Sequence, residues 1–229
     1  MSLRLEMLQV ARVAPKALED ASDLVRDFLL SQQHPDGGFC DRDGESDLYY
    51  TVFGLNALAA FQVEPDMNAV EKFLLKFEEG EGLDLVHLSC LCRCWGTLGQ
   101  KRMPKGLRKV LLNRLEAFRK PCGGWDNNPE REHGTAYGSF LALGAYQDLG
   151  KLPPKPFRIL QSLKHLETPD HAWNNHPNLP VGSTNPTAGA VVLLNNLHLP
   201  INAEVGKWLK KQLHPQGGFV AVPGAPMPD

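Results

Sequence analysis

The sequence lacks several features that would assign the chain to a specialised class of protein. No apolar run approaches the roughly 18 residues that a membrane-spanning helix needs, and the N-terminal stretch MSLRLEMLQVARVAPK has no apolar core of the signal-peptide kind. The formal net charge is only −2, so composition gives no reason to expect nucleic acid as a partner. The five cysteines are an odd number without a secretory context, which favours free thiols and a cytoplasmic location.

A short glycine-rich element recurs along the chain. It reads HPDGGF, KPCGGW and HPQGGF, with a weaker copy, TPDHAW, and its aromatic positions are 86, 48 and 46 residues apart. Half of the first gap predicts a further loop near residue 82, where the sequence reads FEEGEGLD. A period of about 45 residues is typical of stacked repeats. The positions of the repeat motif are Gly37, Gly38, Phe39, Gly123, Gly124, Trp125, Trp173, Gly217, Gly218 and Phe219.

Each repeat is predicted to contain two helices. Before the loop comes an amphipathic run such as LVRDFLLSQQ, in which Leu24, Val25 and Phe28 fall on one stripe. After the loop comes a run with few charges such as YYTVFGLNALAAF, which is typical of a helix buried on most sides. Asp47 is predicted to cap this inner helix or to lie in its first turn. The alternation predicts an all-α fold with an inner and an outer layer. An α/α toroid is favoured, and an extended solenoid is the alternative.

The motif FLLSQQHPDGGFCDRDGESDLYYTVFGLNALAAF resembles the repeat of the prenyltransferase and squalene-cyclase family. The other glycine loops follow the same pattern, and the copies together cover nearly the whole chain after about residue 18. The resemblance implies an α/α toroid of helical hairpins around a central apolar cavity. It divides the chain into an N-terminal extension at residues 1–17 and a repeat domain at residues 18–229.

The number of repeats leaves three interpretations open. The resemblance implies about six helix pairs, whereas the loops of this sequence indicate about four and a half repeats. An incomplete α6/α6 barrel would expose apolar inner faces, which is a liability. The chain is then a fragment of a longer protein, a ring closed by a partner or a second copy, or a partial toroid. The first of these is favoured.

The resemblance also implies two kinds of chemistry, and the sequence carries neither motif in full. Cyclases use an Asp-x-Asp-Asp cluster as a strong acid, whereas the nearest sequence here, Asp41-Arg42-Asp43-Gly44, lacks the last aspartate. Protein prenyltransferases hold zinc with an Asp-x-Cys pair and a histidine in Tyr-His-Thr. The aligned positions Gly182-Ser183-Thr184 carry no such ligand, and Tyr50 stands where the histidine would be. No metal site or cofactor is predicted. Zinc stays open, because the sequence stops at Asp229 before a further histidine.

Five residues are predicted to bind substrate, and none is predicted to be catalytic. EHGTAYGSFLAL resembles the family's His-Gly-Gly-Tyr-Thr-Phe helix start, whose histidine helps to bind a diphosphate. By that resemblance Arg131, His133 and Tyr137 would hold an anion at a helix N-terminus, where the dipole favours negative charge. The alternative is that His133 caps the loop and Tyr137 packs in the core. Tyr49 and Tyr50 are the two predicted cavity residues of the first repeat.

Two further features have a simpler structural interpretation. Cys90, Cys92 and Cys94 lie in LSCLCRCWG, and on a helix only the first and third share a face, which favours buried thiols over a metal site. The basic run KRMPKGLRKVLLNRLEAFRK is interpreted as the solvated face of an outer helix rather than a binding surface.

Two functions remain. The leading hypothesis is a prenyltransferase-like protein that binds an isoprenoid, either a prenyl diphosphate or a terpenoid, in a central apolar cavity, with transferase activity left open. It depends on the repeat resemblance and on the apolar inner helices. The alternative is a non-catalytic toroid scaffold for another protein, which the missing zinc ligands and the missing Asp-x-Asp-Asp favour.

Overall fold

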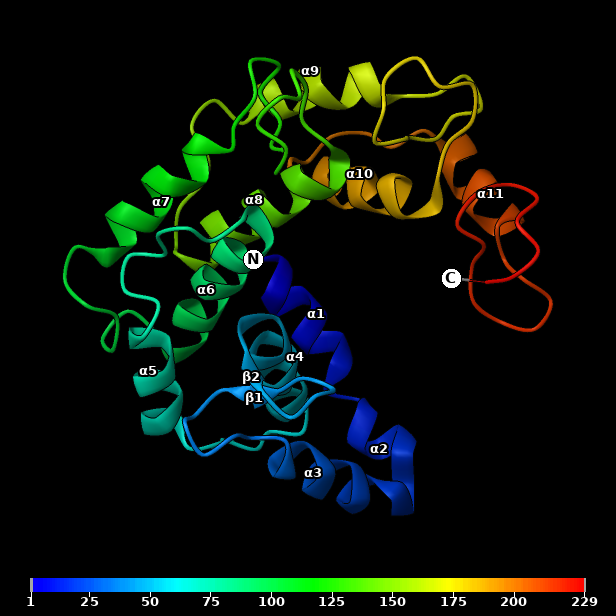
Figure 1. Cartoon of the computed structure of the whole chain (residues 1–229). Coiled ribbons are helices and arrows are strands. Elements are labelled where there is room, and N and C mark those ends of the chain that lie inside the picture. Colours follow the sequence, from blue (N-terminus) through cyan, green and yellow to red (C-terminus); the bar gives the residue numbers. More distant parts are fainter. Residues whose placement is uncertain (1, 229) are drawn as a thin grey trace. The chain divides into compact units, whose positions relative to one another are not determined.

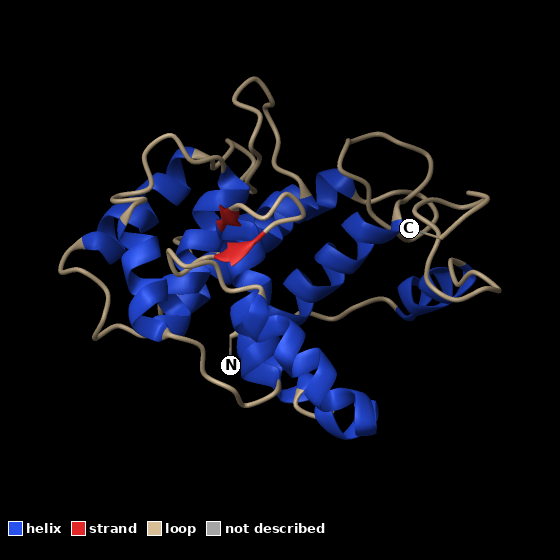
Figure 2. Ribbon diagram, turned by 60° about the horizontal axis from the view of Figure 1, so that its bottom comes forward, coloured by secondary structure: helices blue, strands red, loops and turns tan. Residues whose placement is uncertain are grey.

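The computed structural model describes residues 2–228, and it is helical except for loops and one small sheet (Figure 2). In the described residues the strands are β1 (Phe39–Cys40) and β2 (Ser46–Asp47), which form an antiparallel pair. The helices are α1 (Leu3–Ala11), α2 (Ala14–Leu18), α3 (Ser22–Ser31), α4 (Leu48–Ala60), α5 (Met67–Leu75), α6 (Leu85–Leu98), α7 (Leu107–Ala117), α8 (Ala136–Asp148), α9 (Phe157–Leu166), α10 (Thr184–Asn196) and α11 (Ala203–Lys211).

The chain divides into two compact units. The first comprises Met1–Leu115 and Gly144–Lys151, and the second comprises Glu116–Leu143 and Leu152–Asp229. In the first unit α4 packs against α1, α3 and α6, and the β1–β2 pair lies against α4 (Figure 1). The predicted all-α class is confirmed.

The two predicted kinds of helix are present. The predicted amphipathic runs form α3, α7, α9 and α11, and the predicted apolar runs form α4, α6, α8 and α10. The loop expected near residue 82 lies between α5 and α6, and both of its glycines have positive φ. The strands are a difference from the prediction. They arise because Asp41 Oδ1 accepts the N–H groups of Asp43 at 2.8 Å and Glu45 at 3.1 Å, which closes a tight hairpin turn.

The N-terminal residues form ordered helices. In α1, Leu3 is buried and Arg4 Nε lies 3.1 Å from Asp148 Oδ1, at the end of α8. Arg93 Nε of α6 lies 3.1 Å from the other carboxylate oxygen, so one buried aspartate holds two arginines. The division of the chain at residues 17 and 18 stays a prediction.

The loops that end at Phe39, Trp125, Trp173 and Phe219 share one backbone conformation. The pairs Gln33–Phe39, Arg119–Trp125, Glu167–Trp173 and Leu213–Phe219 each form an isolated antiparallel bridge. In the first loop the Gly37 N–H donates to His34 O at 2.9 Å, and the other three loops repeat this bond. The weaker copy of the motif, TPDHAW, also has this conformation. Its His171 adopts a positive φ of +65° at the position where Gly37 of the first loop has φ +102°. A left-handed backbone favours glycine, which explains why glycine stands there in the other loops.

A hydroxyl group on each following inner helix fixes the loop aromatic. The N–H of Phe39 donates to Thr51 Oγ1 at 2.9 Å, and the N–H of Trp125 donates to Ser139 Oγ at 3.2 Å. The N–H of Trp173 donates to Thr187 Oγ1 at 3.0 Å. Each acceptor is the fourth residue of its helix, in α4, α8 and α10. Sequence reasoning missed these three residues, although their spacing from the aromatic residues is nearly constant.

The residue after the loop proline joins each of the first three loops to a following outer helix. Asp36 Oδ2 accepts from Lys76 at 2.7 Å, directly after α5. Asp170 Oδ2 accepts from Trp208 Nε1 of α11 at 2.8 Å. In the second loop Cys122 takes this place, and its thiol lies 3.3 Å from Ser162 Oγ of α9. Cys122 is therefore a structural residue of the repeat.

Asp36→Asn is expected to remove a stabilising contribution that depends on pH. Burial raises the pKa of Asp36, but hydrogen bonds from Lys76, Ser46, the Gly38 N–H and His34 outweigh burial and hold the pKa well below its usual range. A carboxyl with a lowered folded-state pKa stabilises the protein above its unfolded pKa of about 3.9, and this stabilisation is lost as pH falls towards the folded pKa.

Urea unfolding of both proteins between pH 7 and pH 2 checks this expectation. The variant should be less stable by about 1–3 kcal/mol at neutral pH, and the difference should shrink steadily in acid. A difference that stays constant across this range would contradict the assignment.

Candidate functional site

An apolar groove lies between α3 and α4 in the first unit. Its volume is about 330 Å³. Phe28 and Phe53 stand at its rim with 59% and 54% of their surface exposed, whereas Phe39 at its base is almost fully buried. The residues that line it are Phe28, Leu29, Gln32, Phe39, Cys40, Asp41, Arg42, Tyr50, Phe53, Gly54 and Ala57.

Local sequence explains how the groove is built. Gly54 of α4 allows the Phe39 ring to lie directly on the helix, because a Cβ at this position would overlap the ring. Asp47 is the N-cap of α4, and its Oδ1 accepts the N–H groups of Tyr49 at 2.7 Å and Tyr50 at 3.1 Å. The cap sets the first turn of α4, which carries the two tyrosines beside the groove.

The predicted residues Tyr49 and Tyr50 form an aromatic cluster with Phe53. Tyr50 lines the groove, whereas Tyr49 is exposed and lies outside it. The Tyr49 ring meets the Phe53 ring edge-on at 4.8 Å between centroids, and the Tyr50 ring at 6.0 Å. Such edge contacts are favourable beyond the area that they bury. The structure therefore brings these two predicted residues together and places one of them in the groove.

The charged residues that line the groove, Asp41 and Arg42, belong to a segment rich in acids. The segment 41–47 carries Asp41, Asp43, Glu45 and Asp47, and its single basic residue is Arg42. Arg42 lines the groove and is exposed. Sequence reasoning treated this segment as a failed acid motif and missed its place beside an apolar cavity.

The other predicted binding residues lie in the second unit. Arg131 Nη1 is 3.0 Å from Asp126 Oδ2, and the Asp126 side chain is only 8% exposed, so this guanidinium is already paired. His133 Nδ1 lies 3.2 Å from the Gly134 carbonyl oxygen, and its ring is 6.5 Å from that of His176. Tyr137 is 46% exposed in the first turn of α8. Their role in binding an anion stays a prediction.

The three cysteines of α6 are buried, as their interpretation as core thiols requires. Burial raises the pKa of Cys90 to about 12, and it also raises the pKa values of Cys92 and Cys94 well above the usual range of a thiol. None of these thiols is a nucleophile near neutral pH, because the thiolate is the reactive form. Residues 2–228 contain no group of three or more His, Cys, Asp or Glu side chains that could hold a metal ion. Nor does this part of the chain contain a helix with both the length and the apolar character to span a membrane.

The chain matches a known protein family over part of its length. Residues 5–76 match the family model described as the prenyltransferase alpha-alpha toroid domain. The matched segment contains α3, β1, β2, α4 and every residue that lines the groove. No curated protein matches the chain. The resemblance that the first glycine loop predicts is therefore confirmed for this segment, together with its toroid-type helical hairpin.

Proposed function

We propose, from the prenyltransferase toroid segment at residues 5–76, that this chain is a prenyltransferase-like protein that binds an isoprenoid in the groove between α3 and α4. The observation that carries the proposal is the position of the groove. Every residue of its lining lies within the matched segment, and Tyr50, predicted to bind substrate, is one of them.

The walls suit a branched hydrocarbon chain. Phe28, Phe39 and Phe53 line the groove together with the aliphatic residues Leu29 and Ala57, so most of its wall is apolar. Each methylene removed from water contributes about 0.8 kcal/mol, so a polyisoprenoid would be held chiefly by its apolar length. The polar side chains in the lining are few, chiefly Gln32, Asp41, Arg42 and Tyr50, and such groups would fix the orientation of the ligand.

The charged residues beside the groove favour an uncharged head group. Asp41 and Arg42 line the groove, and Asp43, Glu45 and Asp47 add three carboxylates in the same segment of the chain. Like charges would repel a diphosphate, and Arg42 alone offsets only part of that repulsion. A free isoprenoid alcohol is therefore expected to bind more tightly than the corresponding diphosphate.

Equilibrium dialysis with farnesol, farnesyl diphosphate and geranylgeranyl diphosphate tests the proposal. Farnesol should bind with saturation, and farnesyl diphosphate should bind more weakly. Phe53→Glu should lower the affinity for farnesol at least tenfold, because it places a charge against the apolar wall. Phe157→Glu on α9 is the matched control, since Phe157 is 58% exposed and lies outside the groove. Absence of binding by all three compounds would overturn the proposal, as would equal losses in the two variants.

A further inference from the structure

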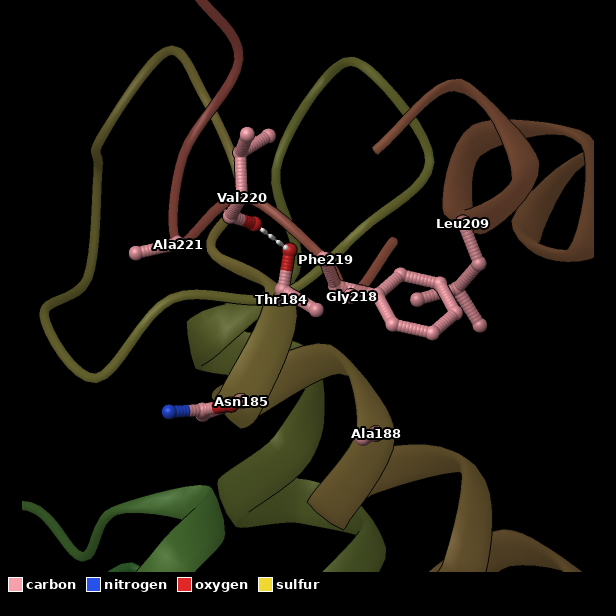
Figure 3. Close-up of a pocket in the computed structure, with 8 residues that line it drawn as sticks. All are labelled: Thr184, Asn185, Ala188, Leu209, Gly218, Phe219, Val220 and Ala221. Atoms are coloured by element: carbon pink, nitrogen blue, oxygen red, sulfur yellow. Dashed lines mark hydrogen bonds between the residues drawn. The ribbon is translucent and has the colours of Figure 1, made fainter. Parts of the chain in front are cut away.

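Two pockets of the described residues differ in chemistry. The pocket beside the loop that ends at Phe219 has a volume of about 430 Å³, and no charged side chain lines it (Figure 3). Its one side-chain hydroxyl, from Thr184, already donates to the Val220 carbonyl oxygen at 2.6 Å. A smaller pocket of about 170 Å³ lies at the start of α7. We call it the basic pocket, and it is lined by Gln100, Met103, Pro104, Lys105, Gly106 and Arg108.

The cations of the basic run at residues 101–120 fall into two groups. In the first group the side chain is paired with an acid. Arg102 Nη1 lies 2.8 Å from Glu71 Oε2 of α5, and Arg114 Nη2 of α7 lies 3.8 Å from Glu81 Oε2. These acids offset the charge of the two arginines, and the Arg102 pair fastens the segment before α7 to α5.

Lys105 and Arg108 belong to the second group. Neither side chain forms an ion pair with an acid in residues 2–228. Both line the basic pocket, and no acidic residue does. Glu78 and Glu79 line a separate pocket that Lys105 also borders, but neither carboxylate pairs with the lysine. The basic pocket therefore holds two cations whose charge is not neutralised by an ion pair.

The segment that forms the basic pocket is held at both ends. Gly99 and Gly106 adopt φ +87° and +89°, and these conformations turn the chain after α6 and before α7. Leu107, the first residue of α7, is buried and anchors the helix in the core. An added Cβ at Gly150 would lie 3.1 Å from Gln100 Nε2, so the turn after α8 closely approaches this wall. A ligand would therefore meet a largely pre-formed surface, as is usual for small-molecule sites.

The side chains of the basic pocket suit a tetrahedral anion. The planar guanidinium of Arg108 can donate two hydrogen bonds to a phosphate group, and the Lys105 ammonium adds a point charge. Lys101 and Lys109 are exposed next to lining residues in the sequence, and they raise the local positive potential. The volume corresponds to about six water molecules of the liquid, which is room for one phosphate group and little more.

We propose that the basic pocket binds a phosphate group, with Arg108 and Lys105 as its main ligands. The pocket and its two unpaired cations carry the proposal. It does not depend on isoprenoid binding between α3 and α4, because no residue lines both sites. Phosphate groups occur in soluble phosphate esters and in the head groups of anionic phospholipids. Both sources offer the pocket the same chemistry, and only the rest of the ligand distinguishes them.

Equilibrium dialysis of the whole chain with radiolabelled glycerol 3-phosphate at low ionic strength tests the proposal. Binding should saturate at one ligand per chain, and excess inorganic phosphate should compete whereas glycerol should not. Lys105→Gln with Arg108→Gln should lower the affinity about tenfold or more, because both charged donors are lost. Lys210→Gln with Lys211→Gln is the matched control, since it removes the same charge from exposed positions outside the pocket. The control should change the affinity less than about twofold.

Cosedimentation with phosphatidylcholine vesicles, with or without phosphatidic acid, distinguishes the two sources of the phosphate group. A phospholipid ligand predicts binding only to vesicles that contain phosphatidic acid, with loss of this binding in the Lys105 and Arg108 double variant. A soluble ligand predicts that the chain binds glycerol 3-phosphate and neither kind of vesicle. Vesicle binding without binding of glycerol 3-phosphate would show a diffuse attraction to a charged surface and would overturn the pocket as the site.

Hydrogen exchange gives a second measurement that needs no variant. Saturating glycerol 3-phosphate should slow exchange in residues 100–110 of the wild-type chain. Both double variants should keep the wild-type circular dichroism and melting curve, because none of the four side chains is buried or forms an ion pair. Absence of saturable binding by the wild-type chain overturns the proposal, as do equal losses in the two double variants or protection confined to other residues.

Discussion

Gly37→Ala is expected to destabilise the protein by about 3–5 kcal/mol. Two causes act at this position. The backbone of Gly37 has φ +102°, which side chains rarely adopt, and an added Cβ would overlap the carbonyl of Ala69 in α5. The helix would have to move away from the first loop, which would also weaken the bond between Asp36 and Lys76. Urea unfolding measures the loss.

Gly217→Ala separates the two causes. Gly217 holds the same position in the fourth loop with φ +93°, but nothing lies within 4 Å of an added Cβ. The substitution should therefore show the backbone effect alone, about 1–2 kcal/mol. Gly44→Ala, with φ +88° and no close neighbour, should behave in the same way. If all three variants lost equal stability, close packing of the loop against α5 would not be the cause.

Asp148→Asn is expected to be the most damaging change that leaves side-chain volume almost unaltered. The Asp148 side chain is 1% exposed, and the two arginines that it pairs with are 14% and 16% exposed. Removal of one member of a buried charge cluster leaves the others uncompensated, which costs about 3–5 kcal/mol. Because Arg4 belongs to α1, the variant should also release this helix, and hydrogen exchange of residues 3–11 should rise.

A triple variant, Asp148→Leu with Arg4→Met and Arg93→Met, is the control for this expectation. Apolar side chains in place of a whole buried charge cluster are often tolerated, so the triple variant should regain much of the stability that the single change loses. A single variant that loses less than about 1 kcal/mol would show that the cluster is weakly coupled to folding.

The elements that depend on local sequence were predictable. Paired glycines before an aromatic residue required a left-handed turn, and the apolar run after Asp47 required a capped inner helix. The partners of these elements were not predictable, because they depend on register between distant segments. Thr51 lies 12 residues after Phe39, and its role emerges only once the loop folds back onto α4. Arg4 reaches Asp148 across 144 residues of sequence.

The same distinction between local and long-range structure applies to the candidate site. Tyr50 was predictable because it follows the N-cap by three residues, and this short distance fixes its place at the groove. Arg131 was predicted as an anion ligand from its neighbours in the sequence. Its pairing with Asp126 depends on how the loop between Trp125 and Gly134 folds, and periodicity gives no information on that path. Arg42 was overlooked because its segment was compared only with an acid motif.

Photocrosslinking with a benzophenone analogue of farnesol, followed by peptide mass spectrometry, tests the central proposal most directly. The proposed binding mode predicts label on residues 28–57, with loss of label in Phe53→Glu and competition by unlabelled farnesol. Label confined to other residues, or label in residues 28–57 that excess farnesol does not displace, would contradict isoprenoid binding between α3 and α4.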